Sequence, residues 1–217
     1  MPPVSPGGPD ISILMVNWNG SALLRRALEA VFASVRRPYE IIVVDNGSVD
    51  DSRAVIESLA AGRGAVRFLL NPGNYGFAHA NNQAYALARG RLILLLNSDV
   101  VLSEGALDAL VGYLDTRPRV GLVTCAQVDS RGRRQHLNRR WPDPLTAALV
   151  FGRRWRPIDK YLLFGRVRRR YRMEGDPPTS PRRIDQAGAA VALLKREALD
   201  AIGGLFDEAF PLFFNDV

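Results

Sequence analysis

An acidic side chain follows directly after one of the most apolar segments of the sequence. Leu92 to Leu96 has the character of a buried strand, and Asn97-Ser98-Asp99 comes immediately after it. A carboxylate at that point would stand at the edge of a sheet, where one acidic group plus phosphate oxygens suits Mg²⁺ or Mn²⁺. The same tripeptide would also serve to shape a turn or to cap the next helix, so both interpretations stay open on these residues alone.

A second carboxylate occupies an equivalent place earlier in the chain. Asp45 ends the apolar segment Glu40 to Val44 and begins a polar, glycine-containing turn that reaches Ser48. Its side chain would accept a hydrogen bond from a nucleobase or a ribose. An ordinary turn-forming aspartate is the alternative.

Segments of strand and helix character alternate around these turns. Strands are expected at residues 11–16, 40–44, 66–70, 92–96 and 120–125, and helices at 21–35, 50–61, 76–89 and 103–115. Ser21 is expected to cap the first helix, and Asp50 or Asp51 the second. This alternation predicts an α/β fold whose parallel sheet is covered on both faces. Ligands bind beyond the carboxyl ends of such strands, so we expect the polar turns to form one crevice.

Composition narrows the classes of protein that the sequence fits. The chain has 217 residues, of which 47% are hydrophobic and 24% charged, as in an ordinary globular domain. A single cysteine, Cys125, excludes an internal disulfide framework and a cysteine-built metal site, and it favours a reducing compartment. No apolar run approaches the ~20 residues that span a bilayer. Residues 1–10 are proline-rich and lack a basic residue, so we expect a disordered arm, no signal peptide and a cytoplasmic location.

Positive charge is concentrated in the second half of the chain. Residues 131–183 contain 15 arginines and one lysine against four acidic residues, a net charge of +12, which leaves −5 for the remainder. Residues 153–172 also contain bulky apolar side chains, a mixture that suits the inner surface of an anionic membrane. A solvated arginine-rich loop is the alternative. Nucleic-acid binding is disfavoured because no recognised motif or aromatic platform accompanies the charge.

Four motifs occur in order and together resemble a known family. They are residues 11–19, 43–48, 74–82 and 95–99, with the sequences ISILMVNWN, VVDNGS, NYGFAHANN and LLNSD, and residues 186–190, 203–207 and 213–216 continue the match. This pattern closely resembles family 2 inverting glycosyltransferases of the GT-A fold, particularly the rhamnosyltransferase-like branch. The resemblance covers residues 11–217 except 135–181. It implies one α/β domain with a Rossmann-like, mostly parallel sheet, in which residues 11–125 bind the nucleotide sugar and the basic residues 126–217 form the acceptor side.

The resemblance also implies site residues. Asp45 would hydrogen-bond the nucleobase, and Asp99 would hold the divalent metal, Mg²⁺ or Mn²⁺, with Asn97 in place of the first aspartate of the family's Asp-x-Asp. The nucleotide-sugar site would comprise Val16, Asn17, Trp18, Asp45, Asn46, Ser48, Asn74, Gly76, Phe77, Asn81, Asn97, Ser98, Gly188 and Ala189.

Asp216 matches the catalytic base of the family, and the alternative for this residue is a helix N-cap. Asn215 precedes it where the family usually has glutamate. The family domain normally continues with a helix beyond this point, so the chain is interpreted as C-terminally truncated.

The implied reaction moves a sugar, by family analogy rhamnose, from a nucleotide-diphospho-sugar to a hydroxyl of a cell-envelope glycan or a lipid-linked glycan. The alternative is a truncated, non-catalytic nucleotide-sugar-binding protein. A P-loop nucleotidase and a dinucleotide fold are poorly supported, because the sequence lacks both Gly-Lys-Ser/Thr and a Gly-x-Gly-x-x-Gly after the first strand.

Overall fold

The computed structural model describes residues 8–144, 146–147, 162–174 and 180–209. These residues fall into two compact units, one formed by the chain up to Cys125 together with the chain from Ala189 onward, and one formed by Ala126 to Gly188. Residues after Ala189 therefore return to the first unit, where they supply a strand of its sheet.

Six strands form the sheet of the first unit, in the order β3-β2-β1-β4-β8-β5. The first four run parallel, whereas β8 is antiparallel to both of its neighbours, so the sheet is mostly parallel, as the sequence predicted. Their bounds are β1 Ile11–Asn17, β2 Tyr39–Asp45, β3 Val66–Leu70, β4 Leu92–Leu96, β5 Leu122–Val123 and β8 Val191–Lys195.

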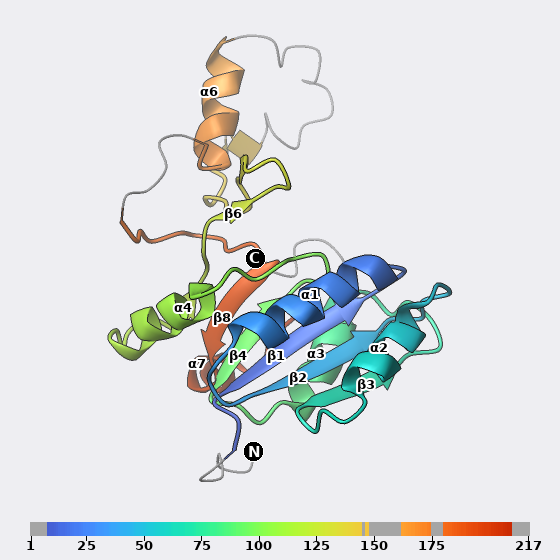
Figure 1. Ribbon diagram of the computed structural model, residues 1–217. Coiled ribbons are helices and arrows are strands. Elements are labelled where there is room, and N and C mark those ends of the chain that lie inside the picture. The colour runs from blue at the N-terminus through green and yellow to red at the C-terminus, as the bar shows by residue number, and fades with distance from the viewer. Residues whose placement is uncertain (1–7, 145, 148–161, 175–179, 210–217) are drawn as a thin grey trace. The chain divides into compact units, whose positions relative to one another are not determined.

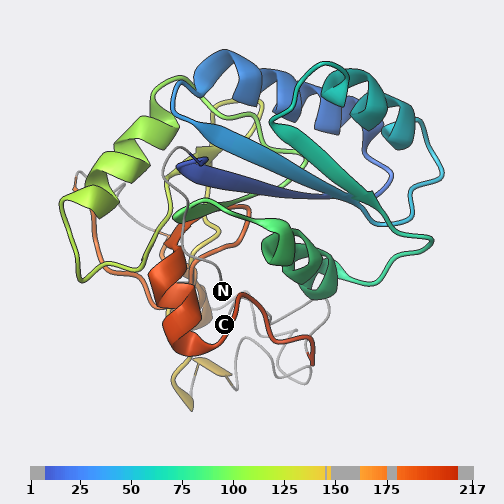
Figure 2. The same cartoon turned by 90° about the horizontal axis from the view of Figure 1, so that it is seen from below.

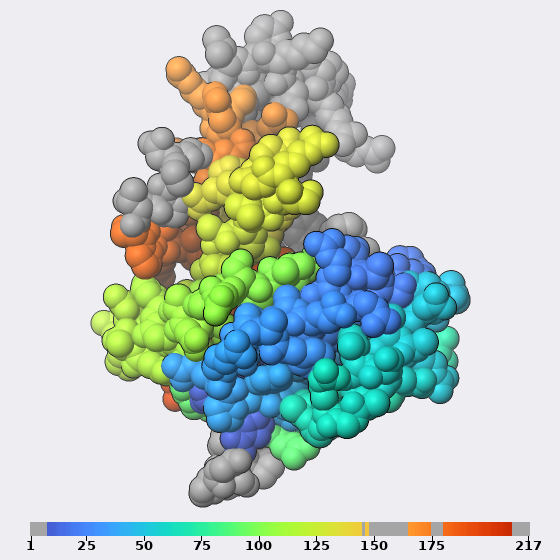
Figure 3. Space-filling model, viewed as in Figure 1, coloured from blue at the N-terminus to red at the C-terminus, as the bar shows by residue number. Residues whose placement is uncertain are grey.

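Helices cover both faces of this sheet (Figures 1 and 2). One face carries α1 Ser21–Ser34, α2 Ser52–Ala60 and α4 Ala106–Asp115, and the other carries α3 Phe77–Leu87 and α7 Arg196–Ile202. On the first face α1 and α2 lie side by side (Figure 3). Alternate residues of β1 serve the two cores: Ile13 packs toward α1, and Leu14 packs toward α3. Burial on both faces explains why the strands are apolar throughout, since each buried large aliphatic side chain contributes about 1.5–3 kcal/mol.

Two helices begin differently from the sequence prediction. The expected cap Ser21 is the first residue of α1, and its N–H donates to Oδ2 of Asp50 at 3.0 Å. A carboxylate from a distant turn thus replaces the local serine cap. The helix expected from residue 103 begins only at Ala106, because Gly105 in the left-handed region occupies the N-cap position. Asp51 occupies the N-cap of α2, but it is Asp50 whose carboxylate accepts the Ser52 N–H.

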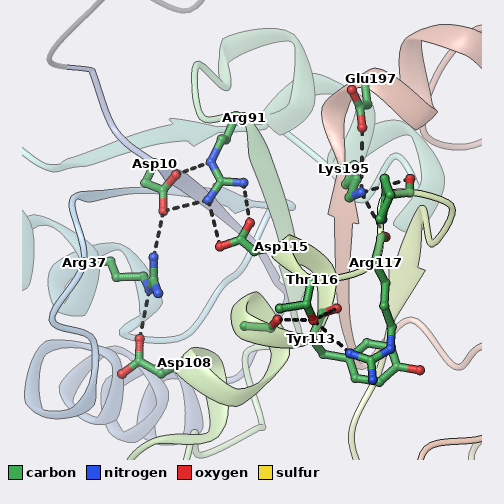
Figure 4. Close-up of polar contacts among 12 residues, drawn as sticks. Asp10, Arg37, Arg91, Asp108, Tyr113, Asp115, Thr116, Arg117, Lys195 and Glu197 are labelled. Carbon is green, nitrogen blue, oxygen red and sulfur yellow. Dashed lines mark hydrogen bonds and ion pairs between the residues drawn. The ribbon is translucent and has the colours of Figure 1, made fainter.

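Ion pairs join several segments at the edge where the parallel strands begin (Figure 4). The Arg91 guanidinium lies between Asp10, at 2.6 Å, and Asp115, at 2.9 Å. Arg37 lies between Asp10 and Asp108, at 3.5 and 3.0 Å. These contacts connect the segment before β1 to the segments before β2 and β4 and to α4, far along the strands from the polar turns.

The second unit contains little regular structure in the part that is described. β6 Gln127–Val128 and β7 Arg134–Gln135 form a hairpin, and α6 comprises Leu162–Tyr171. Arg139 and Gln186 exchange backbone hydrogen bonds at 3.0 and 3.1 Å. Among the helices that can be described in this chain, none combines the length and the apolar character needed to cross a membrane.

Candidate functional site

The polar turns after β1 to β4 leave the sheet at one edge. β1 and β2 are paired along their whole length, so Asn17 lies opposite Asp45 at their carboxyl ends. β4 runs parallel on the other side of β1, with Leu95 opposite Leu14, so Asp99 follows at the same edge. The two carboxylates proposed from the sequence therefore belong to strands that flank β1.

Asp45 is held in place by three hydrogen bonds. Its Oδ1 accepts from Nδ2 of Asn17 at 3.0 Å and from the Ser48 hydroxyl at 2.6 Å, and its Oδ2 accepts the Ser48 N–H at 3.0 Å. The side chain is buried, with 4% of the residue exposed. Oδ2 accepts only one hydrogen bond from the described residues, so it keeps capacity for a second donor.

Asn17 supports Asp45 from within the fold. It has no exposed surface, and its Nδ2 also lies 2.8 Å from the Ser52 hydroxyl. Its Oδ1 is buried and accepts no hydrogen bond from any described residue. A side chain so enclosed offers no surface to a ligand, so its role among the described residues is to orient Asp45 and the turn after β2.

Asn46 connects the turn after β2 to the turn after β3. Its Nδ2 donates to Oδ1 of Asn74 at 2.9 Å and to the Gly76 carbonyl oxygen at 3.2 Å. Its Oδ1 accepts from Nδ2 of Asn71 and from the Tyr75 N–H, both at 3.1 Å. All four positions of this buried amide are used, so it has no group left for a ligand and instead fixes the shape of the second turn.

Gly47 allows these two turns to touch. It has φ +78°, and a Cβ at this position would lie 2.5 Å from the Cα of Gly73. The turn after β1 joins the same assembly, because Oδ1 of Asn19 accepts the Val49 N–H at 2.8 Å and the Asn19 N–H donates to the Ser48 hydroxyl. Hydrogen bonds and backbone contact thus join the turns after β1, β2 and β3.

Four other predicted residues belong to β1, to the turn after it and to α3. Trp18 is 57% exposed on the turn after β1, whereas Val16 is partly buried. Phe77 begins α3, directly after Gly76, and its ring meets that of Phe206 edge to face at 5.5 Å. Asn81 is buried and donates to the Phe77 carbonyl oxygen, one helical turn back, at 2.9 Å.

Asp99 has a free carboxylate at this edge. Its side chain is exposed and makes no hydrogen bond or ion pair with the described residues, while the backbone of Asn97 and Val100 closes the turn. The helix-cap alternative is wrong, because the next helix begins seven residues later with Gly105 at its N-cap. Ser98 is partly exposed beside it.

The side chains of Asp99 and Asn97 fit a metal ion whose other ligands come from a bound nucleotide and from water. Among the described residues no three His, Cys, Asp or Glu side chains are grouped as a protein-only metal site. Mg²⁺ and Mn²⁺ sites on nucleotides commonly use one or two carboxylates, with phosphate oxygens and water completing the shell. An exposed, unpaired Asp99 next to the Asn97 amide satisfies that requirement.

The remaining predicted residues take no part in the hydrogen bonds that join the turns after β1, β2 and β3, or they lie outside the described residues. The Gly188 N–H donates to Oδ1 of Asn138 at 3.2 Å within the second unit. Ala189 packs against the core on the α3 face of the first unit. Asp216 lies outside the described residues.

Comparison with known proteins identifies the family. The model of glycosyl transferase family 2 matches residues 12–199, most of the chain and all of the turns described above. The chain belongs to glycosyl transferase family 2. The protein y4gI of Sinorhizobium fredii is 29% identical over 97% of this chain and 22% of its own length. The N-acetylglucosaminyl-diphospho-decaprenol L-rhamnosyltransferase of Mycobacterium tuberculosis is 25% identical over 95% of this chain and 68% of its own length.

Solved structures place this family 2 chain in the GT-A fold, as its sequence predicted. The mannosyltransferase PcManGT from Pyrobaculum calidifontis, solved with GDP-Man and Mn²⁺, matches with a TM-score of 0.60 at 20% identity, over 93% of this chain and 48% of that one. The chain spans 22%, 35% and 37% of the length of the first three curated relatives that it matches.

Several residues that shape the family 2 site were not found by sequence reasoning. Ser52 and Gln83 are polar side chains whose partners lie in other elements: the Ser52 hydroxyl accepts from Nδ2 of Asn17 at 2.8 Å, and the Gln83 amide exchanges hydrogen bonds with that of Asn71 at 2.8 and 3.2 Å. Nδ1 of His79 lies 2.9 Å from Oε2 of Glu208. The asparagines and the glutamine spaced through residues 71–83 are the signal that could have indicated such a network.

Proposed function

We propose that this chain is the donor-binding and catalytic region of an inverting glycosyltransferase that uses a nucleotide-diphospho-sugar. The observation that carries the proposal is the assembly of the turns after β1, β2 and β3 around Asp45, at the edge from which Asp99 also projects. Membership of glycosyl transferase family 2 supports the reaction class.

The donor's nucleoside would lie against the joined turns. The free acceptor position on Oδ2 of Asp45 suits a base N–H, and the exposed ring of Trp18 suits contact with the base or ribose. Asn46 and Asn74 would give the turn before Phe77 its shape. The backbone near Gly76 would then allow close approach of the nucleoside.

Asp99, assisted by Asn97, would hold Mg²⁺ or Mn²⁺ against the donor's diphosphate. When bound there, a divalent cation supplies positive charge that stabilises the departing diphosphate. PcManGT was solved in complex with GDP-Man and Mn²⁺, which is consistent with this use of a cation in the fold.

The proton of the acceptor hydroxyl would pass to Asp216, by resemblance to the family. As the hydroxyl oxygen forms its bond to the anomeric carbon, the bond from that carbon to the diphosphate oxygen breaks. The electron pair leaves with the diphosphate, and the carboxylate takes the proton. Attack opposite the leaving group inverts the anomeric configuration.

Rhamnose and a lipid-linked glycan are the proposed sugar and acceptor. Support comes from the mycobacterial relative, whose name describes transfer of L-rhamnose to N-acetylglucosaminyl-diphospho-decaprenol. An acceptor of that kind is anchored in a membrane, and the exposed Arg166, Arg169 and Arg170 of α6 would attract anionic headgroups. Peripheral association with the inner face of the cell membrane is therefore part of the proposal.

A thermal-shift series with nucleotide-diphospho-sugars, with and without Mn²⁺, tests donor binding. We expect a stabilising shift that Mn²⁺ increases, loss of the Mn²⁺ increment in Asp99→Ala, and a weaker shift under both conditions in Asp45→Asn. Asp51→Asn is the matched control, because this exposed carboxylate of the same region makes no side-chain cap hydrogen bond. A Mn²⁺ increment that survives Asp99→Ala would remove the metal role.

Transfer is tested separately with Asp216→Asn. We expect this variant to bind the donor as the parent chain does and to form no product. Turnover at the parent rate would exclude Asp216 as the base. Donor binding without product from the parent chain would favour the alternative, a non-catalytic nucleotide-sugar-binding protein.

A further inference from the structure

The segment after α7 runs beside α3 (Figure 2). One asparagine of α3 binds its backbone: Nδ2 of Asn82 donates to the Phe206 carbonyl oxygen at 3.0 Å, and Oδ1 accepts the Phe206 N–H at 3.2 Å. The side chain thus pairs with both polar groups of one backbone residue, as a neighbouring strand would. Its second Nδ2 hydrogen is directed to Oε1 of Glu208 at 2.9 Å, so both hydrogens of the amide are used.

Two further contacts attach the same segment to α3. Nδ1 of His79 lies 2.9 Å from Oε2 of Glu208, and the Phe77 and Phe206 rings meet edge to face. Hydrogen bonds from His79 and Asn82 hold the pKa of Glu208 below its ordinary value. Phe77 is also the first residue of α3 after the turn that Asn46 holds. One helix therefore carries the donor-side turn at its start and the anchored segment along its side.

We propose that Asn82 is a positioning residue, which anchors the chain after α7 at Phe206 and Glu208 and thereby supports the rate of sugar transfer. This inference rests on the proposed function, in which Asp216, eight residues after Glu208, is the base. A general base must come within hydrogen-bonding reach of its proton, and a misplacement of about 1 Å can lower the rate about 100-fold. Anchoring the near end of an eight-residue connection limits the positions that its far end can adopt.

The geometry separates this role from donor binding. Among the described residues, the Asn82 side chain makes no hydrogen bond with Asp45, Asn46 or the turn after β3, and its partners are the backbone of Phe206 and the Glu208 carboxylate. Its neighbour Gln83 does the opposite, since its amide pairs with Asn71 of that turn. Two adjacent amides of α3 thus face two different segments, which provides a matched pair of variants.

The experiment compares Asn82→Ala and Asn82→Asp with Gln83→Ala in the intact chain. Hydrogen exchange at the Phe206 N–H measures the anchor itself, and we expect about five-fold or faster exchange in Asn82→Ala, the change expected for one lost hydrogen bond. Gln83→Ala should leave that exchange unchanged. Asn82→Asp keeps an acceptor for the Phe206 N–H but faces Glu208 with a second negative charge, so it should show intermediate exchange and serve if Asn82→Ala does not fold.

Donor binding and transfer complete the test. We expect both Asn82 variants to bind the nucleotide within about two-fold of the parent, with kcat lowered about ten-fold or more and KM for the donor unchanged. An unchanged Phe206 exchange rate would refute the anchor, and faster exchange with parent kcat would refute its role in positioning. Failure of the proposed function would look different, since Asp216→Asn would then retain turnover, or the parent chain would form no product, while the exchange result at Phe206 stayed the same.

Discussion

Asn17 and Asp45 occupy paired positions at the carboxyl ends of adjacent parallel strands, and a buried hydrogen bond of 3.0 Å joins Nδ2 of the first to Oδ1 of the second. The amide therefore orients the carboxylate that we propose for base recognition. Because Asn17 is fully enclosed, any change in its side chain reaches the site by way of Asp45, Ser48 and Ser52.

Replacing Asn17 tests this support. Asn17→Ala should lower the free energy of unfolding by about 1–3 kcal/mol, because the buried oxygens of Asp45 and Ser52 lose a donor. Asn17→Asp should cost more at pH 7 than at pH 4, since two adjacent buried carboxylates repel when both are ionised. Urea denaturation at the two pH values measures both effects. Equal losses for Asn17→Asp at pH 4 and pH 7 would contradict the geometry.

Gly47 offers a test with an internal control. Gly47 and Gly62 both have positive φ, at +78° and +72°, but only at Gly47 would a Cβ meet backbone, 2.5 Å from the Cα of Gly73. Alanine at either position should cost about 1–2 kcal/mol for the left-handed conformation. Gly47→Ala should cost more than Gly62→Ala and should also weaken nucleotide binding, as measured by denaturation and thermal shift. Equal effects on both would show that the contact between the turns is unimportant.

The lowered pKa of Asp50 should make the free energy of unfolding depend on pH in the acid range. Hydrogen bonds, first from the Ser52 hydroxyl and then from the Ser21 N–H, lower the pKa of Asp50 from its ordinary value of 3.8 to about 2. A lowered folded pKa contributes stability that is present above the unfolded value and is lost as pH falls from about 4 through 2. Asp50→Asn should therefore be less stable than the parent at pH 6, by a modest amount because the carboxylate is exposed.

The measurement for Asp50 is a comparison of urea midpoints from pH 6 to pH 2. The difference between Asp50→Asn and the parent should shrink toward the acid end of that range. A constant difference would mean that the charge of Asp50 does not stabilise the start of α1.

The arginines of α6 should contribute to membrane attraction. Arg166→Ser, Arg169→Ser and Arg170→Ser together should weaken binding to vesicles that contain anionic lipid at least ten-fold, since each basic residue near such a surface contributes about 1 kcal/mol. Arg25→Ser, Arg26→Ser and Arg36→Ser remove the same charge from exposed positions of the first unit and form the control. Vesicle co-sedimentation measures both. Equal weakening by the two sets would indicate a general charge effect.

For the first 115 residues the sequence predicted the succession of strands and helices well. β1, β3 and β4 begin where expected, because apolar runs bounded by polar or glycine-containing turns define strands without help from distant residues. The start of α1 was interpreted differently, since the carboxylate that accepts the Ser21 N–H comes from Asp50. Because this carboxylate lies 29 residues from Ser21, the sequence of α1 itself contains no capping motif that would indicate it.

Contacts between distant segments account for most of what could not be predicted. The direction of β8 depends on the path of the long segment between β5 and β8. Nothing in the residues Val191–Lys195 specifies whether the neighbouring strands run parallel to it. The four hydrogen bonds of Asn46 and the pairing of Asn82 with Phe206 likewise join residues that are 25 or more positions apart. The sequence indicated that these asparagines matter but not which of them would face a ligand.

The segment from Ala126 to Gly188 connects β5 to β8, and these two strands are direct neighbours in the sheet. Its two attachment points are therefore held one strand spacing apart, about 5 Å, by the sheet itself. A segment attached in this way can be shortened, lengthened or exchanged while the ladder between Val123 and Leu193 stays intact. Protein engineers could graft the corresponding segment of another family 2 chain between these two strands and keep the turns that we propose bind the nucleotide.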